Sequence, residues 1–329
     1  MKHRMLVLAS LLVLALTAGV SAQTGFLTIG SGGTAGVYFP IATGIAKMIN
    51  DANIGWRSNA RSTGGSVFNV TAIQSGELQM ALAQNDISFY AYGGTVVEAF
   101  IGKPTRKLRG IAILYPEPIH ILARRDRGIK TVADMKGKQV YVGDIGSGAE
   151  QNSKQVLDGY GLTFADLGQA VRGSATTAVQ LLTDGRIDAM FYTVGVGNAA
   201  IMQAALTAPI EFLAIDAMKL RDIREKYPFL SAFGIAAGIY RGVDTPVVTV
   251  TVQASLVTSS DMSADVVYRV TKLLMDEKVE EFRGIHSNLE RYFHPLKALE
   301  GMAIPLHPGA VRFYQEKNIK IPERLLPPK

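Results

Sequence analysis

Three glycine-rich stretches of this sequence combine small residues with hydroxyl side chains, and they are the best candidates for binding a ligand. They are residues 30–36, 62–66 and 143–148. Each is expected to join a strand to a helix, where the first backbone N–H groups of the helix lack an internal partner and the helix dipole adds positive charge. Small residues let a ligand approach the backbone, so such a loop can bind a carboxylate or another anion.

Other chemistries fit these stretches less well. Residues 30–35 approximate a dinucleotide-binding motif, but the acid expected on the next strand is missing, because residues 57–61 read Arg-Ser-Asn-Ala-Arg. An exported hydrolase with Ser66 or Ser147 as nucleophile would need a nearby histidine, which no spacing offers. Any one stretch alone is compatible with a plain glycine turn. Three stretches at equivalent places favour a binding cleft.

The elements that must position these loops occur twice in the chain. Residues 26–29 predict a strand, and residues 39–50 a helix with Ile41, Ile45, Met48 and Ile49 on one face. The same order returns with a strand at 139–142 and a helix at 149–160. A duplicated strand–loop–helix unit predicts an α/β protein with two lobes, each a mostly parallel sheet flanked by helices.

A second duplicated unit follows each first one. Residues 73–82 align with residues 182–191, and in both a helix is expected to end at a glycine, Gly76 or Gly185, that takes the left-handed conformation. An apolar strand follows and runs into polar side chains. These are Gln84, Asn85 and Asp86 in the first copy, and Tyr192 and Thr193 in the second. Because binding crevices lie at the carboxyl ends of parallel strands, these side chains are candidates for ligand contacts.

The expected organisation divides the chain into four parts. Residues 1–22 are a signal peptide, 23–117 the first part of lobe 1, 118–230 lobe 2, and 231–329 the return to lobe 1 with C-terminal helices. A strand over 108–114 is expected to end at the segment Tyr-Pro-Glu-Pro of residues 115–118, because proline cannot donate to a ladder. That segment is expected to cross between the lobes.

The first twenty-two residues have the pattern of an export signal. A basic head at residues 1–4 precedes an apolar run over 5–20, and Val20-Ser21-Ala22 suits cleavage after Ala22. The alternative is a membrane anchor, for which this run is short of the roughly 20 residues needed. The mature protein is expected to be exported, away from the cytoplasmic pools of ATP and NAD.

Composition excludes several other classes of protein. Of 329 residues, 48% are hydrophobic, which excludes intrinsic disorder, and the absence of cysteine excludes disulfides and thiolate chemistry. The net charge of +6 falls to +4 without Lys2 and Arg4 of the leader, too little for a nucleic-acid binder. The four remaining histidines show no metal-ligand spacing. Asp184 and Asp188 are four residues apart, but the glycine between them breaks the helix that would align the two carboxylates as an acid–base pair. Neither a metal, a cofactor nor enzymatic activity is predicted.

A set of motifs in one order resembles a known family. They lie at residues 30–40, 63–66, 84–92, 115–120, 146–152, 191–195 and 307–310, and include Gly-Ser-Gly-Gly-Thr-Ala-Gly-Val-Tyr-Phe-Pro and His-Pro-Gly-Ala. Over essentially the whole mature chain the sequence resembles the TAXI family, the solute receptors of one class of TRAP (tripartite ATP-independent periplasmic) transporters. The resemblance implies a two-lobed periplasmic binding protein fold of type II-like topology, with the ligand cleft between the lobes.

The resemblance also implies the ligand, the site and the partners. The ligand is a small carboxylate or amino acid, similar to glutamate or glutamine, that is delivered to TRAP permease subunits, the protein's only contact with a membrane. No interlobe arginine of the kind found in a related TRAP receptor family is assigned, although Arg57, Arg61 and Arg172 are candidates. The ligand-binding residues carried over by position are Gly33, Thr34, Tyr38, Thr63, Gly65, Ser66, Gln84, Asp86, Tyr90, Ser147, Gly148, Ala149, Tyr192 and Thr193.

Two alternative functions are compatible with an exported protein of this kind. The same binding fold could serve a sensor kinase or an ATP-driven (ABC) importer in place of a TRAP permease. An exported serine hydrolase is the remaining alternative from another class of function.

Overall fold

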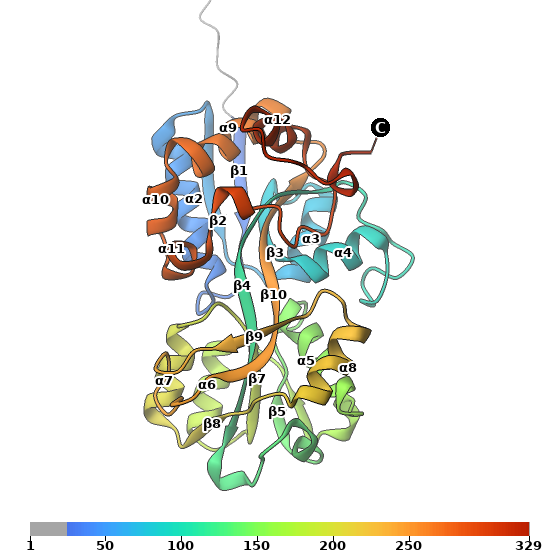
Figure 1. Cartoon of the computed structure of the whole chain (residues 1–329), viewed down its shortest axis with the longest axis vertical. Helices are drawn as coiled ribbons and strands as arrows, with labels where there is room; N and C mark the ends of the chain where they lie inside the picture. Colours follow the sequence, from blue (N-terminus) through green and yellow to red (C-terminus); the bar gives the residue numbers. More distant parts are fainter. Residues whose placement is uncertain (1–24, 329) are drawn as a thin grey trace, which may run out of the picture.

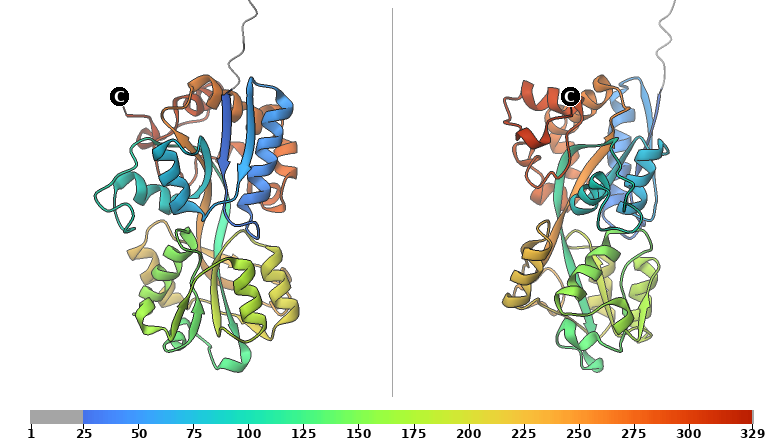
Figure 2. Two further views of the ribbon diagram at one scale, coloured as in Figure 1. Left: turned by 180° about the vertical axis from the view of Figure 1, so that it is seen from behind. Right: turned by 90° about the vertical axis from the view of Figure 1, so that its right-hand side faces the viewer.

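Two lobes make up the part of the chain that the computed structural model describes, residues 25–328 (Figure 1). The predicted signal peptide, residues 1–22, lies outside the described residues. Two long strands, β4 (Leu108–Arg124) and β10 (Val247–Ser259), run side by side through both lobes (Figures 1 and 2). Within residues 25–328 no helix combines the length and apolar character needed to cross a membrane.

The sheet of lobe 1 has the order β2-β1-β3-β10-β4. Strand β1 is parallel to β2 and β3, whereas β10 is antiparallel to β3 and β4. Helices flank this sheet. The elements of lobe 1 are β1 (Gly25–Gly30), α2 (Tyr38–Ala52), β2 (Trp56–Arg61), α3 (Ser66–Ser75), β3 (Met80–Gln84), α4 (Asn85–Gly93), α9 (Ala264–Lys272), a π-helical turn (Leu273–Glu277), α10 (Val279–Gly284), α11 (Ser287–Tyr292) and α12 (Pro308–Glu316).

The sheet of lobe 2 has β5 in parallel contact with β6 and β7, and β4 antiparallel to β7 and β8. Its elements are β5 (Gln139–Tyr141), α5 (Gly148–Gly159), β6 (Gln169–Val171), α6 (Ala175–Thr183), β7 (Ala189–Thr193), α7 (Ala199–Thr207), β8 (Ile210–Phe212) and α8 (Ala217–Lys226). Short 3₁₀ turns lie at Arg125–Arg127, Val132–Met135, Phe164–Asp166, Pro295–Lys297 and Glu323–Leu325. The predicted architecture of two α/β lobes is confirmed. The prediction that each sheet is mostly parallel is wrong, because the long strands β4 and β10 pair antiparallel with their neighbours and make both sheets mixed.

The helical face predicted in the first unit is buried in the core of lobe 1. In α2, Ile41, Ile45, Met48 and Ile49 are at most 1% exposed. Their spacing places them on one side of the helix, so burying that side removes four large apolar side chains from water, each stabilising the fold by roughly 1.5–3 kcal/mol. The packing fixes the start of α2, and with it the first glycine-rich loop, against the sheet.

The crossing strand differs from its prediction. The ladder of β4 continues past Tyr115, since Pro116 and Pro118 stand opposite Gln253 and Thr251 of β10. The prediction that pairing ends at the prolines is therefore wrong. A proline lacks the backbone N–H that would donate to the neighbouring strand, but its carbonyl can still accept a hydrogen bond. Pro118 O, for example, accepts from Val194 N at 3.4 Å. The register shift at Ala254/Ser255 accommodates the missing donors.

The chain returns to lobe 1 later than residue 231. Strand β9 (Ser231–Ile235) pairs with the first part of β10, and Val250 and Val252 pack in the core of lobe 2. Only from Ala254 onward does β10 pair with β3 of lobe 1. The return therefore occurs within β10, because this strand is long enough to belong to both sheets.

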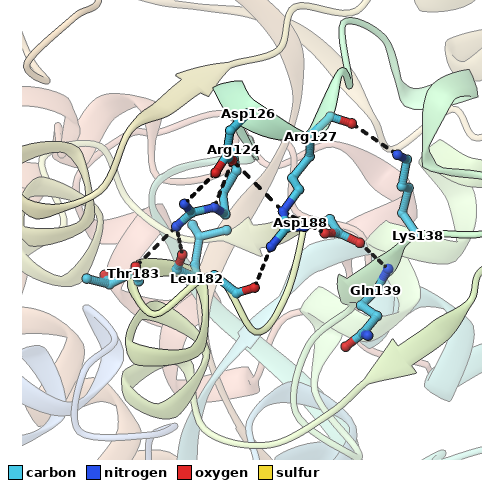
Figure 3. A network of polar contacts seen from close by, with 9 residues as sticks. Arg124, Asp126, Arg127, Lys138, Gln139, Leu182, Thr183 and Asp188 are labelled. Atoms are coloured by element: carbon cyan, nitrogen blue, oxygen red, sulfur yellow. Dashed lines mark hydrogen bonds and ion pairs between the residues drawn. The ribbon is translucent and has the colours of Figure 1, made fainter.

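A network of ionic contacts in lobe 2 joins the turn that follows β4 to the end of α6 and to the residue that precedes β7 (Figure 3). Arg124 binds Asp126 in a bidentate pair at 2.8 and 3.0 Å and donates to the carbonyls of Leu182 and Thr183 at the end of α6. Asp188 pairs with Arg127 at 3.2 Å and accepts from Gln139 N at 2.8 Å. Cations at the last carbonyls of a helix satisfy them and complement its dipole. Asp188 thus has a structural role in this network.

Candidate functional site

A cavity of about 160 Å³ lies between the two lobes, at the point where β4 crosses from one to the other. Both lobes contribute to its wall. The lining residues are Gly32, Gly33, Thr34, Ala35, Gly36, Val37, Tyr38, Gly64, Gly65, Ser66, Gln84, Glu117, Tyr141, Asp144, Ser147, Gly148, Ala149, Ser174, Ala175, Thr176, Tyr192, Thr193 and Val194. The predicted glycine-rich loops therefore meet at one place.

Four helices, α2, α3, α5 and α6, begin at this cavity, since the first residue of each lines it. At α5 the Ser147 hydroxyl accepts a hydrogen bond from Glu150 N at 3.1 Å, which caps the helix. Within the described residues no acceptor is found for the backbone N–H groups of Gly148 and Ala149. Converging helix N-termini with free N–H groups create a positive potential without any charged side chain, which suits an anion.

Hydrogen bonds behind the cavity hold the first two loops in place. Thr63 Oγ1 donates to Ser31 O at 3.0 Å and accepts from Gly65 N at 3.1 Å. Asn69 Nδ2 is shared between Ser31 O and Leu82 O at 2.6 and 2.7 Å. These contacts tie the loop after β2 to the loop after β1, so the donors facing the cavity are fixed before a ligand arrives.

Glu117 of β4 brings a carboxyl group into the cavity from the crossing strand. It is 3% exposed, and the Tyr38 hydroxyl donates to its Oε2 at 2.6 Å. No partner for Oε1 is found within residues 25–328. Burial raises the pKa of Glu117 to about 8, and the Tyr38 hydrogen bond opposes that shift.

Asp144 brings a second carboxyl group from lobe 2. It is half-buried, and its Oδ2 lies 3.9 Å from the position that a Cβ on Gly33 would take, so it faces the first glycine-rich loop across the cavity. Burial raises its pKa to about 6. Among the described residues no lysine, arginine or histidine side chain lines the cavity. The two acids therefore have no cationic partner there.

Two further polar atoms in the wall lack a partner. Gln84 Oε1 and Thr193 Oγ1 have no hydrogen bond among the described residues, although these residues are only 3% and 6% exposed. A buried polar atom without a partner costs about 1–3 kcal/mol, which a bound ligand can recover. Both atoms indicate a place where a polar ligand would be accepted.

The structure brings together most of the residues that the sequence predicted. Eleven of them line the cavity, whereas Thr63, Asp86 and Tyr90 do not. Thr63 holds the first two loops together through its hydrogen bonds to Ser31 O and Gly65 N. Asp86 accepts a hydrogen bond from Asn152 Nδ2 at 2.9 Å, and the Tyr90 hydroxyl accepts one from Gln155 Nε2 at 3.3 Å. These two residues of α4 contact α5 of the other lobe, and no ligand contact is assigned to them from their positions.

Several contacts across the gap show that the two lobes are closed on each other. Phe68 N donates to Gly146 O at 3.3 Å, and Asn198 Nδ2 donates to Ala35 O at 2.8 Å. Together with the Asp86–Asn152 bond they join lobe 1 to lobe 2 around the cavity. A ligand inside would be enclosed by both lobes.

Sequence reasoning missed both acids of the cavity. Glu117 stands between two prolines in a strand that is otherwise apolar, which was a usable signal, and Asp144 lies inside a loop that was itself predicted to bind. The three arginines considered lie elsewhere. Arg61 pairs with Glu77 at 2.6 Å, Arg172 pairs with Glu150 at 2.7 Å, and Arg57 is exposed on β2. None of the three lines the cavity.

Solved structures with similar folds include two with a TM-score of 0.51. One is a protein from Bordetella bronchiseptica, 15% identical, covering 90% of this chain and 99% of its own. Another is described as a putative L-cystine ABC transporter from Listeria monocytogenes, 12% identical, covering 83% of this chain and 99% of its own. The periplasmic aliphatic sulphonate binding protein SsuA from Escherichia coli is 15% identical over 89% of this chain and 83% of its own, with a TM-score of 0.45.

The fold and the cavity define the class as a two-lobed α/β protein of the periplasmic binding protein fold, as the resemblance implied. A family model described as NMT1-like family matches residues 29–317. The chain therefore belongs to the NMT1-like family.

Proposed function

We propose that this protein is the solute-binding subunit of a TRAP-type transporter, which captures a small carboxylate or amino acid between its lobes in the periplasm and delivers it to a membrane permease. The observation that carries the proposal is the cavity at which four helix N-termini from both lobes converge. An anion there would accept hydrogen bonds from N–H groups of both lobes, including Gly148 and Ala149, and so would favour the closed form.

The proposed mechanism is capture by closure. A ligand that touches both lobes binds the closed form more tightly and shifts the population toward it by that difference in affinity. Closure also removes water, which strengthens each hydrogen bond to the ligand. Bending would be absorbed where β4 and β10 pass between the lobes, near the register shift at Ala254/Ser255.

The eleven predicted residues that line the cavity are proposed as ligand contacts. The TRAP assignment rests on the resemblance of the sequence motifs to the TAXI family. The similarity in fold to the protein from Listeria monocytogenes described as a putative L-cystine ABC transporter makes coupling to an ABC importer the second candidate. A gene for a large multi-span permease beside this one would support the TRAP proposal, whereas an ATPase gene there would support the ABC importer.

The hydroxyl groups of Ser66 and Ser147, the two candidate nucleophiles of a serine hydrolase, form hydrogen bonds within the protein. Ser66 Oγ accepts from Gln84 N at 3.1 Å, and Ser147 Oγ donates to Asp144 O at 2.7 Å while capping α5. These bonds support a binding role for the loops over a nucleophilic one.

The test is a thermal-unfolding screen of organic acids and amino acids on protein refolded to remove bound ligand. A ligand at a hundred times its Kd stabilises the folded state by about 2.7 kcal/mol, which raises the unfolding temperature. A shift that grows with ligand concentration is the expected result. If no organic acid or amino acid shifts the transition, the proposed function is wrong.

A further inference from the structure

We propose that an uncharged groove beside the opening of the cavity is the surface on which the membrane permease docks, and that it accepts an uncharged segment of that protein. This inference rests on the proposed function, since it names where the partner of that function binds. The groove, of about 550 Å³, lies between the first glycine-rich loop of lobe 1 and helices α6 and α7 of lobe 2. Among the described residues that line it, no side chain is charged.

The groove adjoins the ligand cavity. Thr34, Ala35 and Thr176 line both of them, and Thr34 and Thr176 are exposed. The cavity therefore opens toward the groove, and a ligand that leaves by this opening passes the groove. A partner that receives the ligand has to cover the same opening, so the groove lies where such a partner must bind.

The lack of charge at the groove extends over three segments of the chain that meet there. They are residues 25–46, 173–183 and 189–210, none of which contains a charged residue although 19% of the whole chain is charged. Helices at a protein surface normally carry charged side chains on the face toward water. Helix α8 of the same lobe does so, with six charged residues within Ala217–Lys226, whereas α6 and α7 have none. The outer faces of α6 and α7 therefore differ from an ordinary solvated surface.

The exposed side chains of α7 are small, apolar, or polar without charge. Ala199 and Gln203, one helical turn apart, line the groove, and Met202 and Leu206 form the adjacent row, 43% and 60% exposed. The buried centres of protein interfaces are depleted of charged residues and enriched in apolar ones such as methionine. A charged side chain of a partner would lose its water here and find no opposite charge, which is costly. The surface therefore fits a protein segment of uncharged side chains.

Both lobes form the walls of the groove, at a place where they contact each other. Asn198, which caps α7, donates from Nδ2 to Ala35 O of lobe 1 at 2.8 Å. Helices α6 and α7 lie on the same side of the molecule as α2 of lobe 1 (Figure 1). Because opening the lobes would separate Ala35 from Asn198, we expect the groove to widen in the open form. A permease segment that fits the closed groove would therefore bind the closed form more tightly.

The test introduces a charge of either sign into the groove. Gln203 is exposed and lines the groove but not the cavity, so Gln203→Lys and Gln203→Glu are the two variants. Gln169→Lys and Gln169→Glu are the matched controls, because Gln169 is an exposed residue at the start of β6, outside the groove and the cavity. Each variant is expressed in a strain of the source organism that lacks the gene. Uptake is measured for the compound that the thermal-unfolding screen identifies, and calorimetry gives the Kd of each purified variant for it.

Both Gln203 variants are expected to lower uptake about tenfold or more and to keep the Kd of the parent, because either charge would be buried without a partner in the docked complex. The Gln169 variants should support uptake like the parent. Parental uptake with both Gln203 variants would show that the groove is not the docking surface. Loss with one sign of charge only would show that the partner is charged there. Each of these two results overturns the inference and leaves ligand capture intact.

Three further results have a definite meaning. A rise in the Kd that accounts for the lost uptake would assign Gln203 to ligand binding and overturn the inference. Light scattering that shows a dimer of the parent, converted to monomers by either charge at Gln203, would assign the groove to contact between two copies of this chain and also overturn it. If the parent itself does not restore uptake of a compound that it binds, the proposed delivery to a permease is wrong.

Discussion

The carboxylate of Asp86 in lobe 1 accepts a hydrogen bond from the side-chain amide of Asn152 in lobe 2, at 2.9 Å. Both residues are fully buried, and Asp86 also accepts from Ile87 N at 2.8 Å. Because α4 and α5 belong to different lobes, this bond joins the lobes in the closed form. We expect it to break when the lobes open, and therefore to stabilise the closed form specifically.

Asn152→Ala is predicted to weaken ligand binding without unfolding either lobe. A buried hydrogen bond to a charged group contributes about 1.5–3 kcal/mol, so the Kd should rise about 10- to 100-fold. Titration calorimetry measures this change. The matched control is Asn50→Ala, which removes side-chain bonds to Ser58 O and N within lobe 1. The control should lower the unfolding temperature and leave the Kd close to that of the parent. Equal Kd values for both variants would contradict the role in closure.

Gly148→Ala is predicted to prevent full closure. Gly148 is the first residue of α5, and a Cβ there would overlap Gln84 Oε1 of the opposite lobe. Alanine fits the helix itself, so the variant should fold and melt like the parent without ligand while its affinity drops about tenfold or more.

The residue opposite Gly148, Gln84, provides the control for this prediction. Shortening the opposing side chain with Gln84→Ala should restore room, so the double variant Gln84→Ala/Gly148→Ala should bind more tightly than Gly148→Ala alone. A double-mutant cycle measures this coupling. Effects of the two substitutions that simply add would show that the close approach of Gln84 to Gly148 does not limit closure.

Affinity for an amino acid is predicted to rise with pH between about 6 and 8. Burial raises the pKa of Glu117 to about 8 in the closed protein, where Tyr38 from α2, Asp86 from α4 and Tyr192 from β7 face it. Below that pH the carboxyl group holds a proton, which a cationic nitrogen must displace, so binding weakens as the pH falls. Calorimetry at pH 6, 7 and 8.5 measures the slope. Glu117→Gln should flatten it, and an affinity that falls as the pH rises would contradict the prediction.

His307 is predicted to make the fold sensitive to acid. Its Nδ1 accepts from Gly309 N at 3.1 Å, so the proton is on Nε2, which donates to Met262 O at 3.0 Å. Burial lowers the pKa of His307 to about 4, below its ordinary value of 6.5. The unfolded state therefore binds a proton first, and the free energy of unfolding falls as the pH drops from about 6.5 toward 4.

The variant His307→Asn should show a shallower loss of stability over that range, because asparagine can cap α12 but does not titrate. Denaturant unfolding at several pH values measures the free energy of unfolding. His294→Asn is the matched control, since His294 accepts from Leu296 N in the same manner on the exposed surface. If both variants keep the slope of the parent, another group is responsible for the acid sensitivity.

Local patterns in the sequence determined the repeated units and the loops of the cavity. The spacing of Ile41, Ile45, Met48 and Ile49 predicts which face of α2 is buried. Glycine-rich stretches that follow strands mark the loops from which helices begin. Gly76 and Gly185 do adopt positive φ values of 83° and 72°, as their position after a helix requires. Such features depend on neighbours in the chain, so a single sequence reveals them.

Tertiary structure alone decided what the loops face. The pairing of β4 with β10 positions Glu117 in the wall of the cavity. The closed arrangement of the lobes places Asp144 opposite Gly33. It also turns Asp86 away from the cavity to bind Asn152. These relations join residues far apart in the chain, and they depend on strand register and lobe contact. The charge of a binding site is the sum of such distant contributions, which no local pattern of residues contains.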